Sequence, residues 1–119
     1  MDYSNEQRQH LRYEVLDYAL IYTDAEEPIR SVVVDIGLGG LQVRTREPIP
    51  NGTSCDLKIG NMEHPPVSIR GEVRYVQPVP GCELYSVGIR FLPESHQQRA
   101  DVAEYVHSVF QRQAETLIS

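Results

Sequence analysis

The chain has 119 residues, of which 40% are hydrophobic and 24% are charged, and its net charge at neutral pH is -6. These values are typical of one soluble globular domain, and the acidic balance argues against a general nucleic-acid binder, which usually presents a basic face. No apolar run approaches the roughly 20 residues needed to span a bilayer, and the polar N-terminus lacks a signal-peptide core. We therefore expect a cytoplasmic protein without direct membrane insertion.

The first twelve residues are predicted to precede the folded core. Residues 1–7 are polar and are expected to form a flexible tail, and residues 8–12 lead into the first strand. Beyond them, apolar and polar residues alternate in short segments separated by turn residues, which is the pattern of strands with one buried face. The six predicted strands span residues 13–23, 29–35, 41–45, 54–59, 67–76 and 84–91.

Two irregularities are expected within these strands. The first strand is predicted to be bent or bulged near Asp17. Gly71 lies inside the fifth strand, where a glycine often marks a bulge or a barrel corner. Both predictions depend on local residue type alone.

The last segment changes from a strand period to a helical one. Ser95 followed by Gln98 matches a capping box and predicts the start of a helix. Apolar residues then recur at helical spacing to about residue 117. We expect this stripe to cover one end of the sheet, and a partner or dimer surface is the alternative. The stripe consists of Val102, Ala103, Val106, Val109, Phe110 and Leu117.

Six short strands with frequent turns favour closure into a barrel, which removes exposed strand edges. The predicted fold is therefore all-β with a C-terminal helix, as a six-stranded antiparallel barrel. We expect the barrel at about residues 13–92 and the helix at about residues 95–117, within a single domain of residues 8–119.

Three glycines follow Asp35 within a short loop, at Gly37, Gly39 and Gly40. Glycine enters positive φ without strain and lets a ligand approach the backbone closely. A hairpin turn needs only one or two such residues. The loop is therefore a candidate binding surface, and a wide hairpin with a bulge is the alternative.

A pair of arginines completes a recognisable pattern with this loop. Arg8 and Arg12 are four residues apart and precede the first strand, and Asp35 opens an Asp-x-Gly-x-x-Gly sequence. Arg-x-x-x-Arg followed by Asp-x-Ser-x-x-Gly on a small β-rich domain is the signature of the PilZ family, which this chain resembles over nearly its whole length. The resemblance implies a PilZ-type barrel that binds the bacterial second messenger cyclic di-GMP. Gly37 departs from the pattern because it stands where the family usually has serine.

The residue types suit that ligand. An arginine fork matches the O6 and N7 acceptors of guanine, binds phosphate and stacks on flat rings. A carboxylate accepts from the opposite edge of guanine, and the family often has an aromatic residue where this chain has Tyr75. The candidate ligand-binding residues are Arg8, Arg12, Asp35, Gly37, Gly39, Gly40 and Tyr75, and further phosphate contacts are open to Arg44, Arg46, Arg70, Arg74 and Arg90.

Each candidate also has an ordinary structural explanation. Arg8 and Arg12 match the spacing of a solvated helical turn, Asp35 is a common turn residue, and Tyr75 fits any strand. The missing serine hydroxyl at Gly37 is worth about 1 kcal/mol, so we expect affinity reduced several-fold rather than abolished.

The resemblance predicts a stand-alone cyclic di-GMP receptor that signals to an unidentified effector protein when the ligand orders its N-terminal arginine segment. The alternative is an adaptor of the same fold that binds little or no nucleotide. The sequence contains no Gly-x-Ser-x-Gly, His-Glu-x-x-His or P-loop motif and no metal-ligand spacing of histidine or cysteine. We therefore expect no enzyme activity, no metal and no cofactor.

Overall fold

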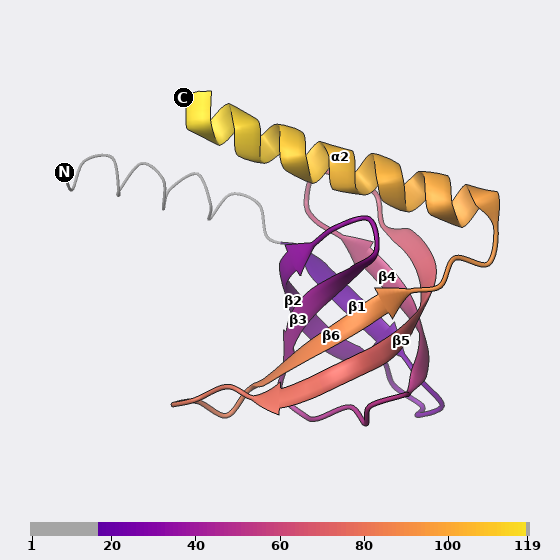
Figure 1. The fold of residues 1–119 in the computed structure, drawn as a ribbon, viewed down its shortest axis with the longest axis vertical. Coiled ribbons are helices and arrows are strands. Elements are labelled where there is room, and N and C mark those ends of the chain that lie inside the picture. The colour runs from indigo at the N-terminus through magenta and orange to yellow at the C-terminus, as the bar shows by residue number, and fades with distance from the viewer. Residues whose placement is uncertain (1–16, 119) are drawn as a thin grey trace.

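The computed structural model describes residues 17–118, which form a closed antiparallel barrel with a helix across one end (Figure 1). The order of strands around the barrel is β1-β2-β3-β6-β5-β4. This arrangement confirms the predicted fold class. The elements are β1 (Tyr18–Tyr22), β2 (Ile29–Ile36), β3 (Gly40–Thr45), β4 (Ser54–Gly60), β5 (Val67–Pro78), β6 (Tyr85–Phe91) and α2 (His96–Ile118).

Alternation of side chains builds the barrel interior. In β4, Cys55, Leu57 and Ile59 are buried, while Asp56 and Lys58 between them are exposed, as the sequence predicts. Equivalent inward positions on the other strands fill the space between the walls, so that the barrel has an apolar core. The outward face is left for polar residues, and the candidate site lies on it.

The irregularity of β5 falls elsewhere than the sequence predicts, and the bend predicted near Asp17 lies at the boundary of the described residues. The first strand begins at Tyr18, so Asp17 precedes it, and the predicted residues 13–16 lie outside the described part of the chain. Gly71 pairs regularly with Cys55 and Phe91, and the bulge of β5 lies between Val73 and Tyr75. The predicted bulge at Gly71 is therefore absent, because the pairing of β5 with β4 and β6 continues through this glycine without a shift, and the alternative of a barrel corner stays a prediction.

A side chain at Gly71 would contact the side chains of Ile89 and Leu57 in the barrel interior. Space within the core, rather than an interruption of the ladder, therefore requires glycine there.

The predicted cap at the start of α2 is present. The Ser95 hydroxyl accepts a hydrogen bond from the Gln98 N–H at 3.1 Å, and the Gln98 side-chain oxygen accepts from the Glu94 N–H at 2.8 Å. Two backbone N–H groups near the helix start are thus hydrogen-bonded by side chains. In the standard capping box the Gln98 side chain would accept from the N–H of the cap residue Ser95, whereas here it accepts from the preceding residue, Glu94.

The predicted apolar stripe of α2 is only partly correct. Val102, Val106 and Val109 are buried together with Tyr105, whereas Ala103, Phe110 and Leu117 are exposed. The buried positions are spaced three and four residues apart, so one row of side chains faces the barrel. Tyr105 joins this row although its hydroxyl is polar, because the hydroxyl finds partners at the barrel rim.

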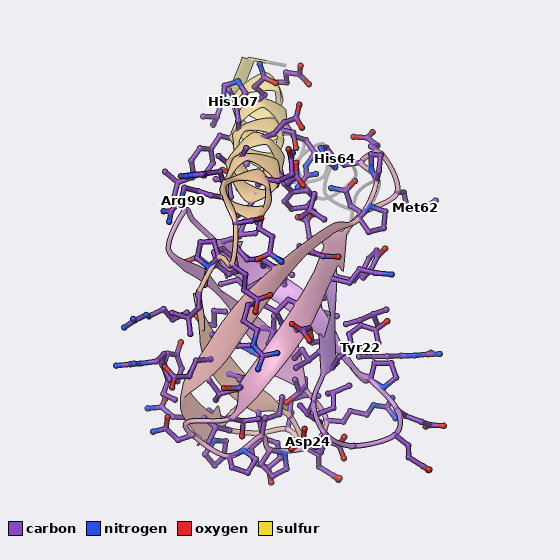
Figure 2. The ribbon with its side chains drawn as sticks, turned by 90° about the vertical axis from the view of Figure 1, so that its right-hand side faces the viewer. Tyr22, Asp24, Met62, His64, Arg99 and His107 are labelled. Atoms are coloured by element: carbon purple, nitrogen blue, oxygen red, sulfur yellow. The ribbon has the colours of Figure 1, made fainter. Side chains whose placement is uncertain are left out.

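Those partners tie α2 to the start of β1. One oxygen of Asp17 accepts from the Tyr105 hydroxyl at 2.6 Å and from the Asn61 amide at 2.8 Å, and the other accepts from Arg112 at 2.7 Å. The ring of His64 packs edge-on against Tyr105 with 5.0 Å between centroids, and Figure 2 shows His64 beside α2. Burial and the hydrogen bond to Asp17 raise the pKa of the Tyr105 phenol. No helix in residues 17–118 has the length and hydropathy of a membrane span.

Candidate functional site

Two β-bulges on the barrel wall present the candidate residues to solvent. The ladder between β2 and β3 shifts between Val33 and Asp35, and the ladder between β5 and β6 shifts between Val73 and Tyr75. A bulge breaks the alternation of faces, so two consecutive side chains point outward. Asp35 is exposed together with its neighbour in β2, and Tyr75 is exposed together with Arg74 in β5.

Strand pairing brings these two positions into one row. Asp35 pairs with Gln42, Gln42 with Gly88, and Gly88 with Tyr75. The row crosses four neighbouring strands, β2, β3, β6 and β5. Residues far apart in the sequence are therefore fixed on one rigid surface, which is how a binding set is held without a mobile loop.

A parallel row lies beside it on the same outer face. Gly40 pairs with Arg90, and Arg90 pairs with Glu72. The two rows enclose an open hollow of about 300 Å³ on the barrel wall. The residues that line the hollow are Asp35, Gly40, Leu41, Gln42, Arg74, Tyr75, Gly88, Ile89 and Arg90.

The floor of the hollow depends on a missing side chain. A Cβ atom on Gly88 would overlap the ring of Tyr75, so the ring lies directly across the glycine. Gly88 is buried while Tyr75 remains 38% exposed. The exposed part of the ring is available for stacking with a flat ligand.

The hollow holds charges of both signs with few internal partners. Asp35 is exposed and its side chain makes no hydrogen bond to another described residue, and the same is true of the Arg90 side chain. Arg74 lies 3.3 Å from a carboxylate oxygen of Glu72 in an exposed ion pair, which contributes little to stability. One acceptor group, two guanidinium forks and an aromatic ring thus surround the same space.

The glycine loop differs from its expected conformation. Gly37, Gly39 and Gly40 all lack a positive φ, and among residues 17–118 the glycines with positive φ are Gly52 and Gly81. The requirement for glycine is steric at Gly40, because a Cβ there would collide with the carbonyl oxygen of Ile89. Gly40 thus lets β3 and β6 approach each other closely.

Gly37 and Gly39 have open space where a side chain would project. Their backbone groups are engaged, since the Gly37 N–H donates to the Gly40 carbonyl and the Phe91 N–H donates to the Gly39 carbonyl, both at 2.9 Å. The loop is therefore held in place by its backbone.

The structure thus unites some of the predicted residues. Asp35, Gly40 and Tyr75 line one hollow, and Gly37 and Gly39 lie on the loop that adjoins it. Arg8 and Arg12 lie outside the described residues.

Sequence reasoning missed Gln42 and Gly88 and left Arg74 and Arg90 unranked among the arginines. Gly88 within a predicted strand was the available signal, because a strand glycine often marks a close approach by another group.

The PilZ domain family model matches residues 6–108 of the chain. The chain belongs to the PilZ family. Among solved structures, its fold is similar to a PilZ domain described as "PilZ domain with c-di-GMP of YcgR from Escherichia coli", with a TM-score of 0.69 and 14% sequence identity. The match covers 87% of this chain and 88% of that chain. No match was found among curated proteins.

Proposed function

We propose that this PilZ domain is a cytoplasmic receptor for cyclic di-GMP. The observation that carries the proposal is the hollow in which Asp35 and Tyr75, both candidates from the sequence, meet Arg74 and Arg90. Family membership supports the same ligand class, as does the fold similarity to the YcgR domain, whose structure is described as containing c-di-GMP.

The residues of the hollow complement a guanine ring and a phosphate. The Asp35 carboxylate would accept from the N1–H and N2–H of guanine, and the Tyr75 ring would stack on the base. Arg90 has no ion-pair partner among the described residues, so its fork is free for a phosphate or for guanine O6 and N7. Arg74 would exchange the carboxylate of Glu72 for the ligand.

The direction of β1 supports a contribution from the N-terminal arginines. β1 runs antiparallel to β2 with Tyr18 opposite Val32, and the Asp17 carbonyl accepts a hydrogen bond from the Val33 N–H at 3.0 Å. The chain therefore enters the barrel at the Asp35 end of β2, and Asp17 and Asp35 line one small hollow beside α2.

Arg12 precedes Asp17 by five residues, a length that spans at most about 18 Å when extended. This length would let Arg12, and Arg8 four residues earlier in the sequence, approach the Asp35 side of the barrel. We propose that the ligand joins these arginines to the barrel wall, and that this ordering changes the surface seen by an effector protein.

Gly37 favours a second candidate function. Without the serine hydroxyl of the family pattern, the domain would act as a PilZ-fold protein adaptor that binds little nucleotide. The effect of cyclic di-GMP on thermal unfolding decides between the two. A ligand at 100 times its Kd stabilises a protein by about 2.7 kcal/mol, which raises the melting temperature measurably.

Titration calorimetry with cyclic di-GMP tests the proposal, and GTP and cyclic GMP should bind more weakly than cyclic di-GMP. Arg8→Ala, Arg12→Ala and Asp35→Ala should each abolish or strongly weaken binding while thermal unfolding stays cooperative. Lys58→Ala is the control, because Lys58 is an exposed cation on β4, a strand that contributes no lining residue to the hollow. Absence of saturable binding by the wild type would support the adaptor, and unchanged binding by Arg12→Ala would refute the role of the leading segment.

A further inference from the structure

A second and larger hollow lies at the opposite end of the β2–β3 hairpin from the glycine loop. Its volume is about 690 Å³, and it shares no lining residue with the hollow of Asp35 and Tyr75. It is therefore a separate concavity at the barrel end far from α2. Its lining residues are Pro28, Ile29, Arg30, Ser31, Val32, Arg44, Thr45, Arg46, Glu47 and Leu84.

Three arginines converge on this hollow from two neighbouring strands. Arg30 lies in β2, Arg44 in β3 and Arg46 just after β3, and within residues 17–118 none of them pairs with a carboxylate. Arg44 donates to the Ser86 hydroxyl at 3.0 Å. With Glu47 as the one lining carboxylate, the local balance is three positive charges minus one, or +2, on a chain of net charge -6.

Such clustering is unfavourable in the absence of an anion. Like charges directly opposite each other on neighbouring strands destabilise a sheet. Arginine forks, in turn, match phosphate oxygens bidentately and are weakly hydrated, so an anion that bridges them is bound strongly. The cluster is thus suited to a phosphate group.

Much of the rest of the hollow is apolar. Val32 pairs with Arg44 across the β2–β3 ladder and is 48% exposed. Ile29 and Leu84 extend the apolar wall. The volume lies within the range of roughly 300–1,000 Å³ typical of small-molecule sites, which combine apolar walls with a few convergent polar groups.

We propose that this hollow binds a small phosphorylated molecule with a flat or apolar group, of which a mononucleotide is the simplest example. The phosphate contacts Arg30, Arg44 and Arg46, and the flat group lies on Val32. Glu47 lowers the affinity by repelling the phosphate. The site operates independently of the cyclic di-GMP hollow, because the two share no residue.

The test uses the full chain and three probes: GMP, inorganic pyrophosphate and unphosphorylated guanosine. GMP and pyrophosphate should bind saturably in calorimetry and guanosine should not. GMP should shift the amide NMR signals of residues 29–32 and 44–47. Arg30→Ala combined with Arg46→Ala should weaken GMP binding at least tenfold, and Glu47→Gln should strengthen it several-fold. Lys58→Ala and Asp35→Ala should leave it unchanged.

Several outcomes would overturn the proposal. Absence of saturable GMP binding would do so, as would equal affinities in the wild type and the double arginine variant. Loss of GMP binding in Asp35→Ala would assign the nucleotide to the first hollow. Binding of an acidic peptide without binding of GMP or pyrophosphate would assign the arginine cluster to a protein partner. Failure of cyclic di-GMP to bind would leave this proposal intact, since Asp35 and Tyr75 do not belong to this hollow.

Discussion

The ring of Tyr75 occupies the space that a side chain at Gly88 would fill. The two residues pair across β5 and β6 next to the bulge that turns Tyr75 outward. A buried glycine in one strand therefore determines how the aromatic ring of the next strand lies in the ligand hollow.

Gly88→Ala should displace this ring. We expect the free energy of unfolding to fall by about 1–3 kcal/mol from overpacking, and cyclic di-GMP affinity to fall about tenfold as the stacking surface moves. Chemical denaturation and calorimetry measure the two effects. In a Tyr75→Ala background the same substitution should cost almost no stability, because the clashing ring is gone. Additive effects of the two substitutions would show that the ring and the glycine are not coupled.

Gly37→Ser restores the residue typical of the PilZ motif. The position has open space for a side chain, so the substitution should be accommodated without loss of stability. One added hydrogen bond of about 1 kcal/mol would tighten cyclic di-GMP binding several-fold. Calorimetry should rank Gly37→Ser above the wild type, and Gly37→Ala, which lacks the hydroxyl, should show no gain. Tighter binding by the wild type than by Gly37→Ser contradicts the account.

Gly40→Ala and Gly39→Ala should differ although the two residues are adjacent. A Cβ at residue 40 would meet the carbonyl oxygen of Ile89, whereas a Cβ at residue 39 meets nothing within 4 Å. Because the backbone of β6 cannot move aside as a side chain could, Gly40→Ala should cost about 1–3 kcal/mol. Gly39→Ala should change the free energy of unfolding by less than about 0.5 kcal/mol. Denaturant unfolding of both variants checks the contrast, and equal stabilities would refute the close approach at Gly40.

Tyr105→Phe removes the hydroxyl that donates to Asp17. The side chain of Asp17 is 14% exposed, and hydrogen bonds to charged groups contribute about 1.5–3 kcal/mol. We expect the free energy of unfolding to fall by that amount. His107→Ala is the control, because His107 is an exposed position of the same helix (Figure 2). A double-mutant cycle with Asp17→Asn should show coupling, and strictly additive losses would mean that the hydroxyl acts elsewhere.

Alkaline pH should destabilise the barrel through Cys55. This thiol is 1% exposed, and burial raises its pKa from 9.0 to about 11. Between these values the unfolded chain has lost the proton that the folded chain keeps, so the free energy of unfolding falls as pH rises, by at most about 1.4 kcal/mol per pH unit for one group. The raised pKa of Tyr105 acts in the same direction.

Urea unfolding at pH 8, 9 and 10 should therefore show a steeper loss of stability for the wild type than for Cys55→Ala. Cys82→Ala serves as the control, because Cys82 is exposed. Parallel pH profiles for the wild type and Cys55→Ala would exclude a contribution from this thiol.

The sequence predicted those features that depend on local pattern. Alternation along β4 and the capping residues of α2 are readable because each reflects contacts within a few residues. The location of the bulges could not be predicted in this way. The shift in strand register beside Tyr75 results from pairing with β6 and from the space above Gly88.

The candidate site divides in the same way. Asp35 and Gly40 belong to a contiguous motif, whereas Gln42 and Arg90 join the hollow through the registers of β3 and β6. Such registers depend on the closed barrel as a whole. A single sequence offers no direct measure of them, so these residues could be found only after the strands were paired.

Closure of the barrel also constrains how another protein can attach to this domain. Each strand within residues 17–118 has a hydrogen-bonded neighbour on both sides, so this part of the chain forms a closed sheet without an edge strand. An extended peptide therefore cannot bind by adding a strand, which is a common mode of recognition for open sheets. We expect a protein partner of the barrel to contact its side chains, its loops or the outer face of α2. Substitutions at those positions will identify where it binds.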